Sequence, residues 1–586
     1  MKSIDNEIIA VFKDIAEKLG YPADEVVLEI PRNSDHGDFS SNLAMKLAKP
    51  LKRNPREIGT ELGSAYPTDS TFVSKVEIAG PGFINFTIAP AFLHKMLMEI
   101  VTGVGEVWDI QDGNGEKWHF EYVSANPTGP LNVVSARSAS VGSVLVNVFR
   151  KLGYQPHSEF YVNDVGGQIR KLGESTQAWL DVFDGKTETP NIPEGGYHGG
   201  YLEEYAKTIQ EHFPIITQKN HDRVEDYYQD IGRVMIASIR VRQEQTLSEF
   251  GVNFDQWVHE SELASSVSYL LKGNKAYPKQ TFKGERTPDL VYDELVNSGL
   301  TYSKDGAVYF KASEFGDSED RVLKTSAGRY TYIVADIAYH LRKQKHHKYA
   351  VNLLGPDHHG HILQMKAALK ALLGEKSSFF HPIIIQQVNL KRDGKPVKVS
   401  KRAGVGITLD DLIAEVGVDA ARFFFLMRRT SSPLDFDLEL AKRHTEENPV
   451  YYVQYAHARI RSILRHPEAL KHLSRTDISF DKKPLLKAWN NEYDLSLLVE
   501  KEELNLLRIM ARFPWTLRTV VRAIDPQPLT TYLIDLAKAF HHFYAHHRVI
   551  GDNKDLTVAR LILCIGVVSV LKDGLELIGV QAPAQM

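Results

Sequence analysis

The stretch WHFEYVSANPTGPLNVVSARSASVGSVLVNVFRKL, residues 118–152, decides the fold of the central part of the chain. Its apolar start, residues 118–123, predicts a strand, and the prolines and glycine of residues 124–130 exclude regular structure after it. A helix is expected next, from about residue 135 to 152. In an open parallel sheet, such a unit places its loop at the carboxyl edge, where helix amides commonly bind nucleotide phosphates. The residues alone leave a nucleotide site and a plain crossover turn equally open.

The regions on either side of this unit carry different patterns. A glycine-rich passage precedes it, and the region before that shows helical spacing and then strand-like runs, at residues 6–19, 41–51, 73–78 and 83–88. From about residue 440 onward no strand pattern appears, and helices are expected at residues 451–464, 494–513, 529–547 and 555–577. We therefore expect three domains, residues 1–108, 109–440 and 441–586, with an insertion at about residues 170–320 in the second.

Length, composition and charge limit the class of protein. With 586 residues, 43% hydrophobic and 25% charged, the chain is expected to fold into roughly three to five domains, which excludes global disorder. A net charge of -4 excludes an overall positive field, so any site for a polyanion must be local. The single cysteine, Cys564, excludes intramolecular disulfides and cysteine-based zinc sites, and its apolar surroundings predict a buried thiol. The acidic start and the lack of an apolar run of about 20 residues predict a cytoplasmic protein with no membrane partner.

A second loop, residues 391–404, gathers six cations and one acid around turn-forming residues. Most charge runs are solvated faces, but the glycines here favour a mobile loop that can close over a triphosphate.

Other motifs are incomplete. A Walker phosphate loop at residues 180–187 lacks its first glycine, and a dinucleotide fingerprint at residues 103–105 lacks its third. The clustered histidines show no metal-binding spacing, so satisfied or solvated histidines are favoured over a metal site at residues 346–347, 358–361 and 541–547.

Within the basic loop, Lys398-Val399-Ser400-Lys401 looks like the KMSKS motif of class I aminoacyl-tRNA synthetases. The surrounding residues resemble the arginyl-tRNA synthetase family, and the resemblance continues at residues 35–38, 121–130, 161–164, 332–339, 357–360, 388–390, 402–404, 416–424, 448–460 and 575–586. It implies a multidomain α/β protein: a Rossmann-type catalytic domain with a doubly wound parallel sheet, a small α+β amino-terminal domain that contacts the tRNA elbow, and an all-α carboxy-terminal bundle that reads the anticodon.

The reaction that the resemblance implies has two steps. Arginine and ATP give enzyme-bound arginyl-adenylate and pyrophosphate, and the arginyl group then passes to the terminal ribose of tRNA(Arg). ATP is expected as a substrate accompanied by Mg²⁺, without protein-bound zinc, and a monomer is expected. Catalysis would come from positioning and from charge stabilisation at the α-phosphate.

The resemblance also implies which residues hold arginine. A guanidinium is a planar cation that carboxylates bind best, and the implied pocket consists of Glu121, Asp336, Ser124, Asn126, Tyr332 and His358. For the two acids the alternative is surface charge. Glu121 favours the pocket, because an unpaired carboxylate in an apolar strand is costly.

The resemblance also implies which residues bind ATP and tRNA. ATP would be bound by Pro127, Thr128, Gly129, Asn132, Ser135, Lys398 and Lys401. Catalysis would rest on Asn132, Ser135, Lys398, Ser400 and Lys401. The anticodon would lie near Tyr455, Tyr544 and Met586, where aromatic faces can stack on bases and core packing is the alternative.

One departure from the family concerns catalysis directly. Where the family has a His-x-Gly-His tetrad, residues 132–135 read Asn-Val-Val-Ser. Asn132 and Ser135 can donate hydrogen bonds, and Ser135 can cap the following helix, but neither carries a positive charge. Because loss of one transition-state donor costs about 10²–10³ in rate, compensation is expected from Lys398, Lys401 and one of His358 and His361.

Val134 is a second difference, since its β-branched side chain stands where the family leaves space for adenine. Three hypotheses follow: a working arginine enzyme with a variant loop, a catalytically inactive paralogue that binds tRNA or arginine, and a synthetase for another amino acid. The intact basic loop favours the working enzyme. Two carboxylates in the pocket argue against a synthetase for another amino acid, because a neutral side chain would leave them without a cation to pair with.

Overall fold

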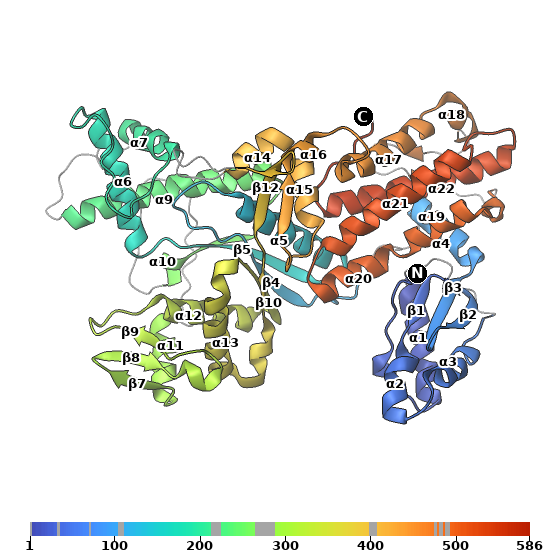
Figure 1. Ribbon diagram of the computed structural model, residues 1–586, viewed down its shortest axis with the longest axis horizontal. Coiled ribbons are helices and arrows are strands. Elements are labelled where there is room, and N and C mark those ends of the chain that lie inside the picture. Colours follow the sequence, from blue (N-terminus) through green and yellow to red (C-terminus); the bar gives the residue numbers. More distant parts are fainter. Residues whose placement is uncertain are drawn as a thin grey trace. The chain divides into compact units, whose positions relative to one another are not determined.

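The computed structural model describes residues 3–31, 36–68, 72–103, 110–212, 224–263, 287–397, 407–473, 478–479, 485–486 and 493–586. The chain divides into two compact units (Figure 1). The central unit comprises Gly113–Arg150 and Tyr154–Arg443, and the terminal unit comprises Met1–Asp112, Lys151–Gly153 and His444–Met586.

A five-stranded parallel sheet forms the middle of the central unit. Its order is β11-β10-β4-β5-β6, with bounds Phe380–Ile384, Tyr349–Leu354, Lys117–Glu121, Gln155–Val162 and Gln256–His259. Every neighbouring pair is parallel. β4 and β10 are buried along most of their length, as expected for strands that helices cover on both faces. The doubly wound parallel sheet predicted from the sequence is confirmed.

The strand order creates a switch point between β4 and β10. From β4 the chain continues through β5 and β6 on one side, and it later forms β10 and β11 on the other side. In such sheets, ligands bind in the crevice at the carboxyl ends of the strands beside the switch point. The fold therefore directs attention to the segments that follow β4 and β10.

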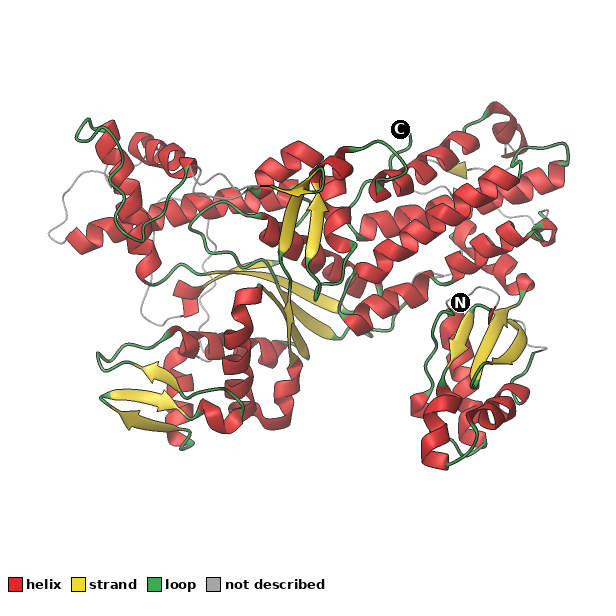
Figure 2. Ribbon diagram, in the orientation of Figure 1, coloured by secondary structure: helices red, strands yellow, loops and turns green. Residues whose placement is uncertain are grey.

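Helices and two small sheets complete the central unit (Figure 2). The helices are α5 (Val133–Lys151), α6 (Gly167–Phe183), α7 (Gly200–His212), α9 (Val224–Glu249), α10 (Glu260–Leu263), α11 (Pro288–Asn297), α12 (Tyr332–His346), α13 (His359–Leu373), α14 (Leu409–Val416), α15 (Val418–Leu426) and α16 (Leu438–Lys442). The small sheets contain β7 (Thr301–Lys304), β8 (Ala307–Phe310) and β9 (Arg321–Lys324), and β12 (Val388–Arg392), β13 (Lys395–Pro396) and β14 (Leu434–Asp437).

α5 is fixed in place at its first turns. A Cβ at Gly142 would lie 2.2 Å from the ring of Tyr122, so the helix approaches the end of β4 at a distance that only glycine permits. The fully buried Arg137 donates to the backbone carbonyls of Gln386 and Ser432, at 2.8 and 2.9 Å. The first half of α5 is thereby held by the residue after β4, by the segment after β11 and by the segment before β14.

The terminal unit combines a small α+β domain with a helical bundle. The domain has an antiparallel sheet of order β1-β3-β2, with β1 (Phe39–Ser41), β2 (Val73–Ala79), β3 (Phe83–Ile88), α1 (Ile4–Lys18), α2 (Leu43–Leu51), α3 (Pro55–Ser64) and α4 (Pro90–Thr102). The bundle contains α17 (Pro449–Leu464), α18 (Pro467–Leu473), α19 (Lys501–Ala511), α20 (Phe513–Ala523), α21 (Gln527–His546) and α22 (Lys554–Leu577). Cys564 is buried in α22, as predicted.

Two sequence expectations for the bundle are wrong in detail. The helix expected at residues 494–513 begins only at Lys501, because Glu500 and Glu503 form a capping box there and Asp494 caps a separate short turn. Strands are also present after residue 440: the two-residue strands β15 (Ile478–Ser479) and β16 (Leu485–Leu486) pair antiparallel, and they are too short to show an alternating pattern.

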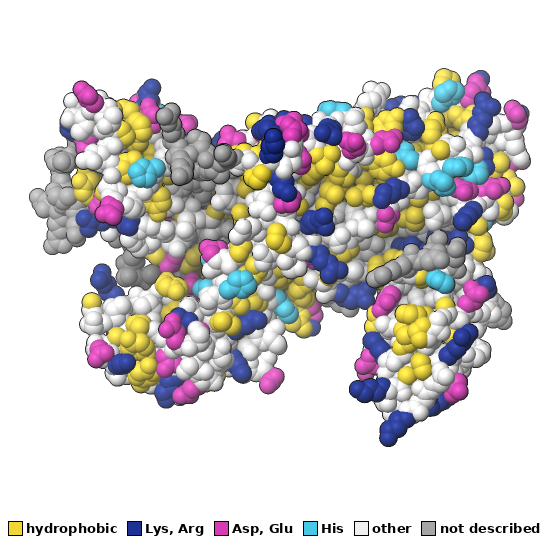
Figure 3. Space-filling view, in the orientation of Figure 1, with side chains coloured by type: hydrophobic (Ala, Val, Ile, Leu, Met, Phe, Trp, Pro, Cys, Tyr) yellow, Lys and Arg dark blue, Asp and Glu magenta, His cyan; other side chains and the backbone are white. Residues whose placement is uncertain are grey.

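The surface carries both signs of charge. On the face shown in Figure 3, the Lys and Arg side chains are interspersed with Asp and Glu side chains. This mixture agrees with the net charge of -4, and it means that any binding site for an anion is a local feature of the surface. Within the described part of the chain, no helix has both the length and the apolar character needed to cross a bilayer.

Candidate functional site

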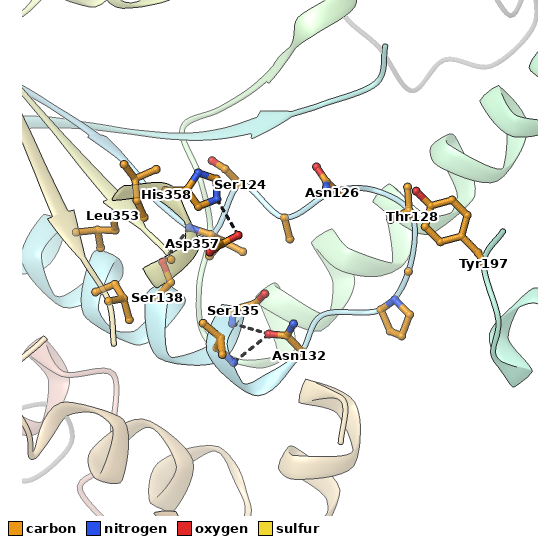
Figure 4. A pocket seen from close by; sticks show the side chains of 18 of the residues that line it. Ser124, Asn126, Thr128, Asn132, Ser135, Ser138, Tyr197, Leu353, Asp357 and His358 are labelled. Carbon is orange, nitrogen blue, oxygen red and sulfur yellow. Dashed lines mark hydrogen bonds and ion pairs between the residues drawn. The ribbon is translucent and has the colours of Figure 1, made fainter. Parts of the chain in front are cut away.

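A cavity of about 860 Å³ lies at the switch point (Figure 4). Four segments line it: the loop after β4 with the first two turns of α5, the end of β10 with the residues that follow, Ile385 directly after β11, and the loop before α7 with the start of α7. Many residues predicted to bind substrates lie in this lining, namely Ser124, Asn126, Thr128, Gly129, Asn132, Ser135 and His358. Pro127 is buried in the same loop. The predicted ATP residues of the described chain are thus brought together with part of the predicted arginine set.

The backbone bends sharply where β4 ends. Val123 and Ser124 have φ angles of 69° and 39°, a region that non-glycine residues rarely adopt. The Ser138 hydroxyl accepts a 3.0 Å hydrogen bond from the N–H of Val123, and the Ser124 N–H donates to the carbonyl of Tyr122 at 3.0 Å. Strain of this kind persists where the surrounding structure enforces it, and it is common at functional sites.

Asn132 caps α5. Its Oδ1 accepts hydrogen bonds of 3.0 Å from the backbone N–H groups of Val134 and Ser135 (Figure 4). The expectation that Ser135 caps this helix is wrong, because Ser135 lies inside α5 and its own N–H is one of the capped groups. Both Asn132 and Ser135 line the cavity, where the amide and the hydroxyl are neutral donors.

The insertion supplies a wall of the cavity that was not predicted from the sequence. Tyr197 and Tyr201 line the cavity, and the Tyr201 hydroxyl donates to the carbonyl of Thr128 at 2.7 Å. Gln243 on α9 donates to the carbonyl of Gly129 at 2.8 Å. These contacts hold the loop after β4 from outside. Two tyrosines in a polar segment give no chemical signal, so the sequence alone could not reveal this wall.

Glu121 ends β4, and both of its carboxylate oxygens accept hydrogen bonds from the protein. Oε2 accepts from Nζ of Lys343 at 2.5 Å and from Nδ2 of Asn352 at 2.7 Å, and Oε1 accepts from the Ser124 hydroxyl at 3.1 Å. The Glu121 and Lys343 side chains are only 9% and 2% exposed. Lys343 was not among the residues predicted for the site, although it stands two helical turns after Asp336 on α12 and therefore on the same side.

Asp336 lies on α12 with its side chain 19% exposed and His361 Nδ1 at 3.9 Å. Burial raises the pKa of Asp336 to about 8, and the negative charges of Glu260 and Glu121 add to the increase, while Lys343 opposes it. This carboxyl is therefore largely protonated near neutral pH. A bound cation would favour its charged form.

The other two residues predicted for arginine lie at the periphery. Tyr332 begins α12, is 61% exposed and contacts Gln364 through a 3.4 Å hydrogen bond from its hydroxyl. His358 lines the cavity with Nε2 3.6 Å from Oδ2 of Asp357, and its ring centroid is 6.1 Å from that of His361. The two histidine rings therefore lie between the cavity and Asp336.

The basic loop is described only in part: the structure does not describe Lys398, Ser400 and Lys401. The residues before them form β12 and β13. Lys391 pairs with Asp435 at 2.6 Å, and Arg392 pairs with Glu415 and Glu439, each at 2.7 Å. These two cations of the loop are consequently neutralised by the protein.

The residues predicted near the anticodon lie in the bundle. Arg459 stands over two of them, with its guanidinium carbon 4.7 Å from the ring centroid of Tyr455 and 5.1 Å from that of Tyr544. Tyr544 and Met586 are 38% and 54% exposed. Tyr455 stacks on Tyr451 at 5.8 Å and is partly buried. Aromatic faces and a guanidinium thus occur together on an accessible part of the bundle.

Neutral groups dominate the described lining of the cavity. Among these residues, His198 and His358 are the side chains able to carry a positive charge, and Asp357 is the carboxylate. Backbone amides, hydroxyls and the Asn132 amide are suited to orient phosphates and a carboxylate. Charge neutralisation of a triphosphate would need further cations.

Comparisons with known proteins indicate one and the same family along the length of the chain. Family profiles described as arginyl tRNA synthetase N terminal domain, tRNA synthetases class I (R) catalytic domain, and DALR anticodon binding domain match residues 2–88, 276–429 and 453–586. Arginine–tRNA ligase of Caldanaerobacter subterraneus is 39% identical over 571 residues, covering 96% of this chain and 94% of that protein. The Thermotoga maritima ligase is 39% identical over 565 residues, covering 96% of each. The Thermus thermophilus arginyl-tRNA synthetase structure shares the fold, with a TM-score of 0.73 at 19% identity over 99% of this chain and 100% of that one.

Proposed function

The chain belongs to the arginyl-tRNA synthetase family, and from this premise we propose how its cavity performs the family's reaction. The chain is an arginine–tRNA ligase, a class I enzyme with ATP as a substrate. It activates L-arginine to arginyl-adenylate and transfers the arginyl group to tRNA(Arg). The observation that most supports the proposed site is the cavity at the switch point, which joins residues predicted for ATP and for arginine.

The reaction needs no covalent bond to the protein. In the first step, a carboxylate oxygen of arginine attacks the α-phosphorus of ATP, the bond to the bridging oxygen breaks, and pyrophosphate leaves with the electron pair. In the second step, a terminal ribose hydroxyl of the tRNA attacks the arginyl carbonyl, loses its proton and displaces AMP. The protein therefore contributes by orientation and by charge.

ATP lies against the loop after β4, where the donors are Thr128, Gly129, Asn132 and Ser135. Tyr201 and Gln243 hold this loop, so its donors are oriented before ATP binds. Lys398, Ser400 and Lys401 close over the phosphates, and the two lysines add positive charge to that of the described lining. His358 adds a further imidazole near the same space.

Mg²⁺ is proposed to enter with ATP. Such ions usually keep several waters and bind one or two carboxylates together with substrate phosphates. Asp357, the carboxylate of the described lining, fits this donor set. The bound ion would neutralise phosphate charge. No protein-bound zinc is proposed.

Arginine is proposed to lie with its polar end against Ser124 and Asn126 and its guanidinium toward Asp336. Tyr332 and His358 border the entrance. Glu121 acts at the floor of the pocket, where Lys343 balances its charge. Arginine binding would supply the cation that favours ionised Asp336.

The bundle is proposed to read the anticodon through stacking on Tyr455 and Tyr544, with Met586 beside them. We further propose a monomer in the cytoplasm, where tRNA is charged for protein synthesis. Sedimentation of the purified chain with and without tRNA tests whether the protein is a monomer.

Aminoacylation of total tRNA with labelled arginine and ATP tests the function. We expect charging by the parent and none by Lys401→Ala, which controls for contaminating host enzyme. tRNA binding without charging would instead favour the inactive paralogue and place the loss in residues 132–135. The full-length ligase relatives support the working enzyme.

A further inference from the structure

The last turns of α9 hold two other parts of the central unit from one side of the helix. Arg242 and Thr246 stand four residues apart, and Gln243 and Thr246 stand three apart, so these side chains are neighbours on the helix surface. Gln243 and Thr246 are only 2% and 1% exposed. Buried polar side chains are hydrogen-bonded in folded proteins, and the partners of these three show what the helix holds.

Gln243 holds the loop after β4. Its Nε2 donates to the carbonyl of Asn126 at 3.3 Å and to the carbonyl of Gly129 at 2.8 Å. Each carbonyl belongs to the peptide bond before a proline, Pro127 or Pro130, and these two peptide bonds have no N–H group. Asn126 and Gly129 both line the cavity. Gln243 therefore fixes both ends of the proline-containing part of the loop beside the cavity.

Arg242 and Thr246 hold the first turn of α14. The Oδ1 atom of Asp410 accepts a hydrogen bond of 2.8 Å from the Thr246 hydroxyl and one of 2.9 Å from Nη2 of Arg242. Hydrogen bonds to an ionised group are shorter and stronger than those between neutral groups. Two donors from adjacent turns of one helix meet on a single oxygen and define the position of this carboxylate. α14 is consequently attached to α9 at its second residue.

The first turn of α14 also contacts the loop after β4 directly. The Leu409 N–H donates to the carbonyl of Leu131 at 2.8 Å, and Thr408 forms an isolated antiparallel bridge with Asn132. In the chain, α14 follows the basic loop, residues 391–404. The loop after β4, α14 and α9 therefore contact one another in all three pairs, and a shift of α14 would be passed to Asn132 at the cavity.

The end of α9 is itself fixed to the middle of the central unit. Arg422 on α15 is fully buried, and its Nη1 donates to the carbonyl of Phe250, the residue directly after α9, at 3.0 Å. Its Nη2 donates to the Ser143 hydroxyl on α5 at 2.9 Å. The end of α9 is thus joined to α5, whose first two turns line the cavity. α9 can therefore act as a fixed reference for the loop and for α14.

The ion pair of Arg242 with Asp410 differs from the buried contacts around it. The two side chains are 43% and 29% exposed. Ion pairs with this much contact with solvent contribute little to the stability of a protein. Neither residue is among the described residues that line the cavity. The pair instead defines where α14 stands relative to α9 and to the loop after β4.

We propose that Asp410 is a positioning residue for arginine activation, acting through Arg242 and Thr246 to keep α14 against the loop that carries Asn132. This inference rests on the proposed function and deepens it, because it assigns part of the rate to residues outside the cavity. A misplacement of about 1 Å caused by a change far from the reacting atoms costs on the order of 10²-fold in rate. The neutral Asn132 amide depends on orientation in particular, because its hydrogen bonds are directional.

Asp410→Ala, Arg242→Met and the double variant test the assignment. The control is Arg233→Met, which removes an arginine from the same helix whose Nη1 lies 2.9 Å from Oδ1 of Asp230. The readouts are the rate of arginine-dependent exchange of pyrophosphate into ATP with tRNA present, the KM for tRNA(Arg) and the midpoint of thermal unfolding. The parent must charge tRNA, since a parent without activity would refute the proposed function rather than this inference.

We expect Asp410→Ala and Arg242→Met each to lower the exchange rate at saturating substrates about 10-fold or more, with an unfolding midpoint close to that of the parent and an unchanged KM for tRNA(Arg). The double variant should lose no more than Asp410→Ala alone, whereas two independent losses would multiply. Arg242→Lys keeps a charged donor and should retain most of the rate. Arg233→Met should resemble the parent.

If Asp410→Ala does not fold, the comparison of Arg242→Met with Arg242→Lys decides, since both keep Asp410. A parent-like exchange rate in folded Asp410→Ala, losses that multiply in the double variant, or a rate that falls only together with the unfolding midpoint would overturn the proposal. Equal losses in Arg242→Met and Arg233→Met would do the same.

Discussion

Nζ of Lys343 lies 2.5 Å from Oε2 of Glu121, and the pair joins α12 to the end of β4 inside the protein. The contact fixes the helix that carries Asp336 against the strand that leads into the cavity. It also supplies the positive charge that opposes the upward shift of the Asp336 pKa. One buried ion pair thus affects both the position and the charge of Asp336, on the side of the site that is proposed to bind arginine.

Lys343→Met should destabilise the central unit. The change leaves the Glu121 carboxylate buried without its cation, which costs about 3–5 kcal/mol in comparable pairs. We expect a lower urea midpoint of unfolding, and we expect the double variant with Glu121→Gln to recover most of the loss. Exposed Lys376→Met is the control for removing a lysine. A midpoint equal to that of the parent would show that the pair does not stabilise the fold.

Asp336→Asn should raise the KM for arginine strongly while the protein stays folded. Asparagine fills the same space but cannot become the anion that a guanidinium requires. Steady-state aminoacylation with varied arginine measures the effect, and thermal unfolding confirms that the variant is intact. An unchanged KM would remove Asp336 from the pocket.

Asn132 variants separate capping from catalysis. Asn132→Ala removes the Oδ1 that caps α5 and should lower the free energy of unfolding by about 1 kcal/mol. Asn132→Asp keeps a capping oxygen but turns a negative charge toward the triphosphate, so we expect parent-like stability with arginyl-adenylate formation slowed about 10²-fold. Asn132→His, which restores the family residue, should not abolish activity. If it does, the loop is built around asparagine.

The sheet and the bundle were predictable because their patterns are local. An apolar run followed by a proline-rich loop and a helical stretch is sufficient to indicate the unit around β4. The exact end of that strand was not predictable: residues 118–123 read as strand, but Val123 and Ser124 adopt positive φ and the strand ends at Glu121. Neighbouring elements impose this conformation, and a β-branched residue gives no sign of it in sequence.

The part of the candidate site that one continuous segment forms was predictable. The part that forms where distant segments of the chain meet was not. The loop from Ser124 to Ser135 was identified as a unit and lines the cavity. The pairing of Glu121 with Lys343 joins residues far apart in the chain, and the wall formed by Tyr201 depends on where the insertion folds. Such contacts follow from packing, which periodicity does not encode.

Tyr544→Ala should weaken tRNA recognition without affecting arginine activation. Its exposed ring lies near Arg459, and stacking of one base on an aromatic ring is worth about 1–3 kcal/mol. We expect the KM for tRNA(Arg) to rise about 5- to 150-fold, with little change in the KM for arginine at saturating tRNA. Exposed Tyr302→Ala in the central unit is the control. Equal effects of the two variants would mean that Tyr544 does not contact the anticodon.

His457 should make the stability of the bundle depend on pH. This residue of α17 is 2% exposed, and its Nδ1 lies 2.7 Å from the carbonyl oxygen of Pro583. Burial lowers its pKa to about 4, and the charges of Arg461 and Lys572 add to the decrease. As the pH falls below the ordinary value of about 6.5, the unfolded chain binds a proton that the folded bundle does not, so the free energy of unfolding decreases until about pH 4.

His457→Gln should remove most of this dependence, because glutamine can still donate to the Pro583 carbonyl but does not titrate. From the two pKa values, the effect between pH 7 and pH 4 is at most about 3 kcal/mol. Chemical denaturation at several pH values measures it, with exposed His546→Gln as the control. If the parent and His457→Gln lose the same stability between pH 7 and pH 4, the imidazole of His457 has no part in acid unfolding.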